Sequence, residues 1–350
     1  MINLSKRSIE TLGYKEYPDT DILEISFGII KVYSLRGVVF ENDCKCTNSE
    51  IVTLSDRCTV VIAQSVVEAS KLLISDEFSV GEWELLSETK IPPPFLLIYF
   101  KESVPRELRG GFRQQKDGCI LTYDAFSSEK AEVRVWEEET LPIIVTSLIV
   151  NLSTLDNPVE LVPMGRRVFG VTSGGARLTE GSKITGGGSG YVSLPKSIDK
   201  INGLLGESKK LLGVLTKDVC RNFYVALNEP DRMKQFLGYF QFLERYTHST
   251  YKGLSYEKDA KDVFNVPQRI YKPVSKFFGN VFSNSKSLAQ RFHWCAILAW
   301  NNLEENDIEA FLEAKKVRDE LSHGEHVEEQ ELPVEKVKNL ALKILGTNKD

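Results

Sequence analysis

The chain has 350 residues, of which 42% are hydrophobic and 27% are charged, and its net charge at pH 7 is −5. This length suffices for about two domains of roughly 100–200 residues each, which excludes a small fold that depends on disulfides or metals. The composition, with 24 Gly and 13 Pro, excludes a disordered or fibrous protein.

Neither a run of about 18 apolar residues nor an apolar segment of the kind found in signal peptides occurs in the sequence. We therefore expect a cytoplasmic protein without membrane contact. The six cysteines lack the dense spacing of a disulfide framework, so we expect reduced thiols. Cys44 and Cys46 form an isolated C-x-C pair, which is too little for a zinc site. We expect no metal and no cofactor.

Residues 22–171 consist of short β-prone runs separated by turn residues. Several runs, among them 131–136 and 141–150, are interpreted as strands, and residues 68–75 as a short helix. Three prolines at 92–94 exclude a helix before the strand at 95–100. The alternation predicts a mainly antiparallel β domain, either a sandwich or a barrel.

Residues 170–190 are rich in glycine. A phosphate-binding loop would need G-x-x-x-x-G-K-[ST], and the order of Gly181, Ser182 and Lys183 does not fit it. This segment therefore indicates a mobile hairpin that leads into a linker over residues 171–195. The first domain would cover residues 1–195, and the whole chain is predicted to be α+β with two domains.

From residue 196 to 350 the apolar residues recur at helical spacing, which predicts an all-α bundle of five or six helices. Asp231 is expected to cap a helix that ends near His248, and Asn284 or Ser285 a helix that ends near Asn301. Asp307 would open a helix that Gly324 stops, and Pro333 would begin the last one.

The end of the penultimate predicted helix reads Arg318-Asp319-Glu-Leu-Ser-His323-Gly324. An R-x-x-x-x-H string with a polar residue after the Arg, before a final amphipathic helix, resembles the signature of the HEPN helical bundles. The aromatic-rich run 238–246, with Glu244 at its centre, is similar to the Apea-like branch of that family. The resemblance covers about residues 198–346 and nothing in the first domain.

This resemblance implies a metal-independent endoribonuclease in which the ribose 2′-oxygen attacks the phosphate, and a homodimer whose two motifs meet. It also implies prokaryotic defence against phage, or a toxin system. His323 supplies an imidazole, the side chain best suited to proton transfer at neutral pH, and Arg318 can grip two phosphate oxygens. Positions five apart on a helix point about 140° away from each other, so two copies would complete one site. Asp319 and Glu244 complete the predicted catalytic set.

A basic stretch supports an RNA partner, because no acidic residue occurs from Val263 to Leu303. Cations there would neutralise phosphates, and an exposed ring could stack on a base. Most aromatic residues of the stretch, Phe277, Phe278 and Phe282 among them, are expected in the core. The predicted RNA-binding residues are therefore Arg269, Tyr271, Lys272, Lys276, Lys286 and Arg291.

Simpler explanations remain beside these hypotheses. Arg318 could pair with neighbouring carboxylates on a solvated helix, and His323 could only cap it. The bundle would then be a catalytically inactive adaptor, used for oligomerisation or nucleotide binding. In either case the β domain would be a sensor or regulator triggered by a protein or ligand. Its basic cluster of Arg106, Arg109 and Arg113 is expected to be a solvated loop.

Overall fold

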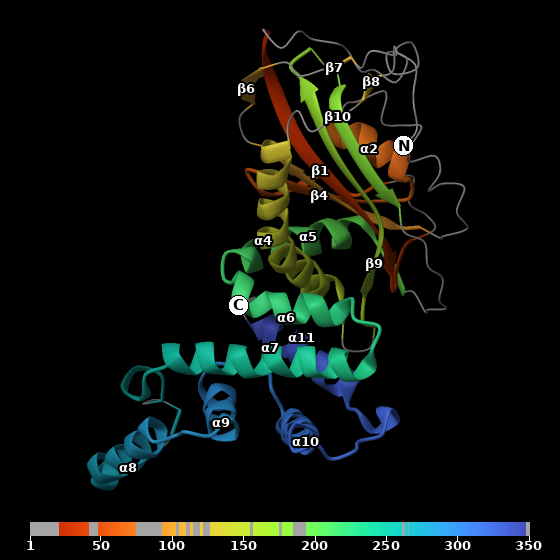
Figure 1. Cartoon of the computed structure of the whole chain (residues 1–350). Helices are drawn as coiled ribbons and strands as arrows, with labels where there is room; N and C mark the ends of the chain where they lie inside the picture. The colour runs from red at the N-terminus through yellow and green to blue at the C-terminus, as the bar shows by residue number, and fades with distance from the viewer. Residues whose placement is uncertain are drawn as a thin grey trace. The chain divides into compact units, whose positions relative to one another are not determined.

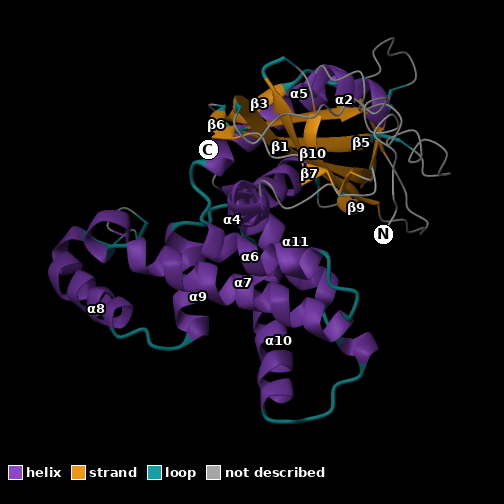
Figure 2. Cartoon of the chain, turned by 45° about the horizontal axis from the view of Figure 1, so that its top comes forward, coloured by secondary structure: helices purple, strands orange, loops and turns teal. Residues whose placement is uncertain are grey.

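The structure, a computed structural model, describes residues 21–41, 48–74, 93–102, 105–109, 113–114, 120–121, 127–154, 157–174, 177–184, 194–260, 263–264 and 266–347. Contacts within the chain divide it into two compact units. The first comprises Met1–Ile144 and Asn151–Leu212, and the second comprises Val145–Val150 and Gly213–Asp350. Strands occur in the first unit and helices make up the second (Figures 1 and 2).

The first unit is built on one antiparallel sheet with strand order β10-β9-β1-β5-β4-β3. Strand β1 lies at its centre, paired with β9 on one side and with β5 and β6 on the other. The strands are β1 (Ile22–Arg36), β3 (Val52–Ser55), β4 (Cys58–Ala63), β5 (Phe95–Lys101), β6 (Arg106–Arg109), β9 (Glu160–Thr172) and β10 (Arg177–Ile184).

Two small sheets complete the described strands. One pairs β2 (Val38–Phe40) with β11 (Leu194–Lys196) in parallel, and the other pairs β7 (Arg113–Gln114) with β8 (Ile120–Leu121). The prediction of a mainly antiparallel sheet is confirmed. Within the described strands the main sheet is an open row, so the expected sandwich or barrel is not what the structure has.

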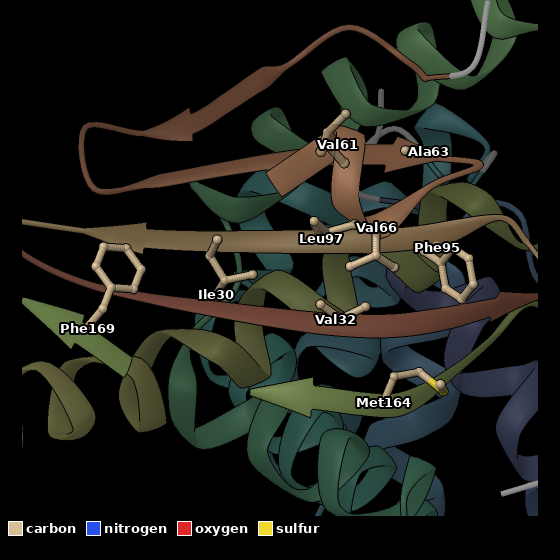
Figure 3. Close-up of a cluster of buried hydrophobic side chains, with 10 residues drawn as sticks. Ile30, Val32, Val61, Ala63, Val66, Phe95, Leu97, Met164 and Phe169 are labelled. Carbon is tan, nitrogen blue, oxygen red and sulfur yellow. The ribbon is translucent and has the colours of Figure 1, made fainter. Parts of the chain in front are cut away.

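The two faces of the sheet carry different side chains, because successive residues of a strand point to opposite faces. Ile30 and Val32 of β1 join Val61 and Leu97 in an apolar cluster against helix α2 (Val66–Ile74), as Figure 3 shows. On the other face Lys31 of β1 forms an ion pair with helix α4 (Ser127–Leu152). The sheet is thus covered by a helix on each face.

The assignment of strands at residues 131–136 and 141–150 is wrong, because both segments lie in helix α4. Valines and isoleucines favour strands on local propensity, but Leu141, Ile144, Val145 and Leu148 are buried at helical spacing. The last turns are buried on all sides, which removes the polar face that would have revealed the helical period. Tertiary burial therefore outweighs strand propensity here.

The glycine-rich segment contributes strand β10, which forms a hairpin with β9 and contains Gly181, Ser182 and Lys183. Residues 185–190 lie outside the described part of the chain. The prediction of a linker over residues 171–195 is wrong for the described residues of that range, because β10 pairs with β9 and β11 pairs with β2. Helix α5 (Ile198–Leu212) follows. By its contacts α5 belongs to the first unit, and the backbone N–H of Glu50 donates to Asn202 Oδ1 at 2.9 Å.

The second unit is a helical bundle centred on α7. Helices at the C-terminal end are as predicted, but α5, which was expected in the bundle, belongs to the first unit. Helix α7 packs against α6, α9, α10 and α11. The helices are α6 (Lys217–Leu227), α7 (Arg232–Gly253), α8 (Tyr271–Ser283), α9 (Leu288–Leu298), α10 (Glu305–Ser322) and α11 (Val334–Gly346), with short turns η2 (Tyr256–Ala260), η3 (Gln268–Ile270) and η4 (Glu329–Glu331).

Stacked aromatic rings form the core of the bundle. Phe311 of α10 lies against Phe292 of α9, with ring centroids 3.7 Å apart, and Phe240 of α7 stacks on Phe311 at 6.1 Å. All three rings are buried. Burying an aromatic side chain contributes about 1.5–3 kcal/mol, so these contacts fix where α10 lies on α7.

Candidate functional site

The candidate site lies at the C-terminal end of α10, whose two ends are set by capping residues. At its start Glu304 and Asp307 form a capping box, in which the Glu304 backbone N–H donates to Asp307 Oδ2 at 2.7 Å. At its end Gly324 has φ +81°, a conformation that glycine adopts without strain. The predicted stop at Gly324 is confirmed, and it places His323 at the C-cap.

Arg318 is held by three neighbours from α7 and α10. Its Nη1 lies 2.8 Å from Asp319 Oδ1, its Nη2 lies 3.6 Å from Glu244 Oε1, and its guanidinium lies over the ring of Phe240 at 5.1 Å. The side chain is 26% exposed, so solvent reaches part of it. Glu244, a member of the predicted catalytic set, therefore forms an ion pair with Arg318.

Asp319 joins two cations. Besides Arg318 it accepts a hydrogen bond from Lys315 Nζ at 2.5 Å. The hydrogen bond from Lys315 and the charges of Arg318, Lys315 and His323 outweigh partial burial, and together they hold the pKa of Asp319 below its ordinary value. Asp319 is therefore ionised throughout the neutral pH range.

His323 is exposed and borders a shallow hollow of about 430 Å³. Lys315, Asp319 and Glu320 also line this hollow, whereas Arg318 does not. Asp319 therefore both pairs with Arg318 and lines the hollow that His323 borders. Within one chain the structure brings Arg318, Asp319 and Glu244 together and places His323 beside Asp319.

Five of the six predicted RNA-binding residues fall into two groups. Tyr271, Lys272 and Lys276 of α8 line one hollow of about 710 Å³ next to η2. Arg269 and Lys286 are exposed elsewhere.

Arg291 differs from the other five because it is held inside the bundle. Its Nη1 lies 2.9 Å from His248 Nδ1, its Nε donates to the Ser285 carbonyl oxygen at 3.1 Å, and its guanidinium lies over the ring of Tyr251. These contacts tie α9 to α7, so they give Arg291 and His248 a structural role.

One expected core residue is at the surface. Phe277 is 61% exposed, whereas Phe282 is buried as expected and Phe278 is partly covered by stacking on Phe264. The prediction for Phe277 is wrong because α8 has apolar residues on more than one face and only one face can pack against the bundle.

Other candidate chemistries find no support in the described residues. Within those ranges there is no group of three or more His, Cys, Asp and Glu side chains arranged to hold a metal. His293 and Cys295, two positions apart on α9, do not form a nucleophile pair, because His293 is exposed and Cys295 is buried. Burial raises the pKa of the Cys58, Cys220 and Cys295 thiols to about 12, which leaves them unreactive.

Two predictions concern residues that lie wholly or partly outside the described part of the chain. Cys44 and Cys46 lie outside the described residues, as do the side chains of Arg109 and Arg113. Arg106, the remaining member of the basic cluster, is half-buried on β6 rather than free in a loop. It forms ion pairs with Glu102 at 2.5 Å and with Glu132 at 2.7 Å.

Sequence reasoning missed a buried charged group between the main sheet and α4. Glu137 is 3% exposed and pairs with Lys31 Nζ at 3.1 Å. The Arg166 Nε–H is shared between both carboxylate oxygens of Glu137 at 3.1 Å, and Arg166 Nη2 donates to Glu137 Oε2. Burial opposes its ionisation, but Arg166 and Lys31 outweigh it, so the pKa of Glu137 is lowered. The sequence signal was a lysine within the apolar run of β1.

Comparisons with family models, with curated proteins and with solved structures gave no match to this chain. Among the described residues no helix combines the length and apolar character needed to cross a bilayer. The HEPN resemblance therefore depends on the residues of the motif and their positions on α7 and α10.

Proposed function

We propose that this protein is an endoribonuclease of the HEPN type that works as a homodimer. The observation that carries the proposal is the exposed imidazole of His323, which lies beside Asp319 at the stopped end of α10 while Arg318 is anchored one turn earlier. An imidazole can exchange protons at neutral pH, and an arginine stabilises the charge of a phosphorane. The resemblance implies that the chemistry needs no metal.

The reaction proceeds by transfer of a phosphoester within the RNA. One imidazole takes the proton of the 2′-hydroxyl, the 2′-oxygen forms a bond to phosphorus, and the bond from phosphorus to the 5′-oxygen breaks. A second imidazole gives its proton to the leaving 5′-oxygen. The products are a 2′,3′-cyclic phosphate and a 5′-hydroxyl, so atoms and charge balance without another reactant.

Two copies of the chain supply what one copy lacks. A single copy has one His323, and its Arg318 is already compensated by Asp319 and Glu244. Two α10 ends facing each other about a twofold axis would bring two imidazoles and two guanidinium groups to one phosphate. The longer contact, 3.6 Å to Glu244, is the one that a phosphate would replace.

The test is RNA cleavage in excess EDTA by the full chain and by the variants Arg318→Ala and His323→Ala. His326→Ala is the matched histidine control, since His326 is also exposed and pairs with Glu328 at 3.0 Å. Arg245→Ala is the arginine control on the exposed face of α7. Cleavage by the wild type and both controls, with a loss of at least about 100-fold in the two test variants, is expected.

Intact RNA at several-fold excess of wild-type dimer would refute the nuclease and favour a second function, a catalytically inactive adaptor. The enclosure of the Arg318 guanidinium by Asp319, Glu244 and Phe240 favours that alternative, because it is also the arrangement of a structural ion pair. Cleavage that stops with chelator would point to a metal-dependent enzyme instead.

The first unit is assigned a sensor or regulatory role in this proposal, with a protein or ligand as its trigger and the cytoplasm as its location. Defence against phage or a toxin system is the setting that the resemblance implies. This setting is supported only by the motif at the end of α10, since no residue of the main sheet belongs to the resemblance.

A further inference from the structure

Lys315 belongs to the candidate site by its position, although the proposed reaction does not use it. Lys315, Asp319 and His323 follow one another at intervals of four residues, and positions four apart are neighbours on a helix surface. All three line the hollow of about 430 Å³ at the end of α10. Lys315 Nζ donates to Asp319 Oδ2 at 2.5 Å. The carboxylate that anchors Arg318 is therefore also held by a lysine.

The two oxygens of Asp319 face different cations. Oδ1 lies 2.8 Å from Arg318 Nη1, whereas Oδ2 accepts the hydrogen bond from Lys315. Arginine and carboxylate groups often pair through two parallel hydrogen bonds, which requires both carboxylate oxygens to meet one guanidinium. Because Lys315 holds Oδ2, this oxygen is less able to form a second bond with Arg318.

The arrangement bears on Arg318 Nη2, the nitrogen assigned to the phosphate in the proposed reaction. Nη2 lies 3.6 Å from Glu244 Oε1, which is beyond the length of about 3.2 Å that ordinary N–H···O hydrogen bonds reach. If both oxygens of Asp319 were bound to Arg318, a phosphate would have to replace a bidentate pair. With Lys315 in place, it replaces only the long contact with Glu244.

A second lysine pair on α10 shows that the Lys315 contact is more than an ordinary surface pair. Lys316 is also four residues from its partner, Glu320, but the two groups are 3.7 Å apart and the Lys316 side chain is 79% exposed. The Lys315 side chain is only 29% exposed. Exposed pairs of lysine and carboxylate hold their geometry loosely because water competes for both groups. The shorter and more covered pair is the one able to fix a carboxylate.

The charges of the hollow argue against direct RNA binding by Lys315. The charged residues that line it, apart from His323, all come from α10 and the turn after it, and they are Lys315, Lys316, Asp319, Glu320 and Glu325. Helix α9 contributes only Ala289 to the lining. Three carboxylates beside two lysines do not attract a polyanion. Lys315 is thus better placed to act on Asp319 than on a phosphate.

From these observations we infer that Lys315 is a positioning residue of the proposed nuclease, which holds the Asp319 carboxylate so that Arg318 keeps Nη2 available for the scissile phosphate. Lys315 acts through Asp319 and does not touch the RNA. The inference rests on the proposed function, because it assigns Arg318 to the phosphate.

The experiment measures kcat and KM for cleavage of a labelled single-stranded RNA in EDTA by the full chain and three variants. Lys315→Met removes the charge and the donor but keeps an unbranched side chain, and Lys315→Arg keeps both charge and donor. Lys336→Met is the matched control, because Lys336 is exposed and donates to Glu313 of α10 at 2.7 Å.

We expect Lys315→Met to lower kcat at least about tenfold while KM changes less than about threefold, because the contact between Arg318 and phosphate strengthens in the transition state. Lys315→Arg should restore kcat to within about threefold of the wild type, since an arginine can also donate to Asp319. Lys336→Met should cleave as the wild type does. A lysine that binds RNA directly would raise KM instead, and one with only a structural role would lower Tm without changing kcat of the folded protein.

A crystal structure of Lys315→Met supplies a readout that does not depend on activity. Asp319 Oδ2 is expected to turn to Arg318 and to lie within about 3.2 Å of a guanidinium nitrogen. An Asp319 that keeps its wild-type orientation would overturn the inference.

Three kinetic results would also overturn the inference while leaving the nuclease in place. They are an unchanged kcat in Lys315→Met, a rise in KM alone, and a loss of kcat that Lys315→Arg does not restore. Intact RNA with the wild type would refute the proposed function itself, and with it the role of Lys315 in cleavage; the crystal structure would then decide only whether Lys315 orients Asp319.

Discussion

Replacing Glu137 by Gln tests the buried ion pairs between α4 and the main sheet. The substitution keeps the size of the side chain but leaves Lys31 and Arg166 without their carboxylate. Removing one partner of a buried ion pair costs about 3–5 kcal/mol, and the lower end applies because the Arg166 side chain is 26% exposed and can be partly hydrated. We expect a loss of about 3 kcal/mol in the free energy of unfolding at pH 7.

The effect depends on pH with a definite sign. The folded-state pKa of Glu137 is below its ordinary value of 4.5, so the stability that its charge contributes is present above that value and is lost as pH falls through the folded pKa. The difference between wild type and Glu137→Gln should therefore shrink on acidification below about pH 4.

Guanidinium unfolding followed by circular dichroism at pH 7 and at pH 3 measures both quantities. Glu138→Gln is the control, because Glu138 is exposed on the next position of α4. If this segment were a strand, Glu137 and Glu138 would also point to opposite faces, so the Glu138 control does not distinguish a strand from a helix. The decisive control is Glu139→Gln, because a strand would place residues 137 and 139 on the same face, whereas in α4 residue 139 is exposed. An equal loss at 137 and 139, or a loss below about 1 kcal/mol at 137, would refute the reasoning.

Three further substitutions test the packing. Phe311→Ala removes a buried ring that stacks on Phe292 at 3.7 Å and should cost about 3–5 kcal/mol in thermal or denaturant unfolding; a change below about 1 kcal/mol would contradict the aromatic core. Gly28→Ala brings a Cβ within 2.6 Å of the Phe169 ring, so a loss of about 1–3 kcal/mol is expected, and an unchanged midpoint would show that the ring moves freely. Gly324→Ala forces an L-residue to φ +81° and should cost about 1–2 kcal/mol, with Gly346→Ala, where a Cβ meets open space, as the control.

Local signals in the sequence were sufficient for most of the second unit. Asp231 caps α7 with its side chain accepting from the Lys234 backbone N–H, Gly324 ends α10, and Pro333 precedes α11. Several boundaries were misplaced. Helix α9 is capped by Ser287 rather than by Asn284 or Ser285, α10 begins at Glu305 rather than at Asp307, and α7 continues past His248 to Gly253. Capping residues act through hydrogen bonds within a few positions, which is why the sequence alone reveals them.

Features that depend on the whole fold were not predictable in the same way. Helix α4 is buried along its last turns, so the sequence shows no helical alternation of apolar and polar residues there. Without that helix, Glu137 could not be recognised as a buried carboxylate that faces the sheet. The exposure of Phe277 depends on which face of α8 meets the bundle. The structure also pairs Glu244 with Arg318, two residues far apart in the sequence that belong to one predicted catalytic set.

The nuclease proposal is tested most directly by the chemistry of the ends it leaves on RNA. Mass spectrometry of fragments produced in EDTA should detect a 2′,3′-cyclic phosphate on the upstream product and a 5′-hydroxyl on the downstream one, with neither end formed by His323→Ala. Fragments that carry 3′-hydroxyl and 5′-phosphate ends, or the same cyclic product from His323→Ala, would contradict attack by the 2′-oxygen at this histidine.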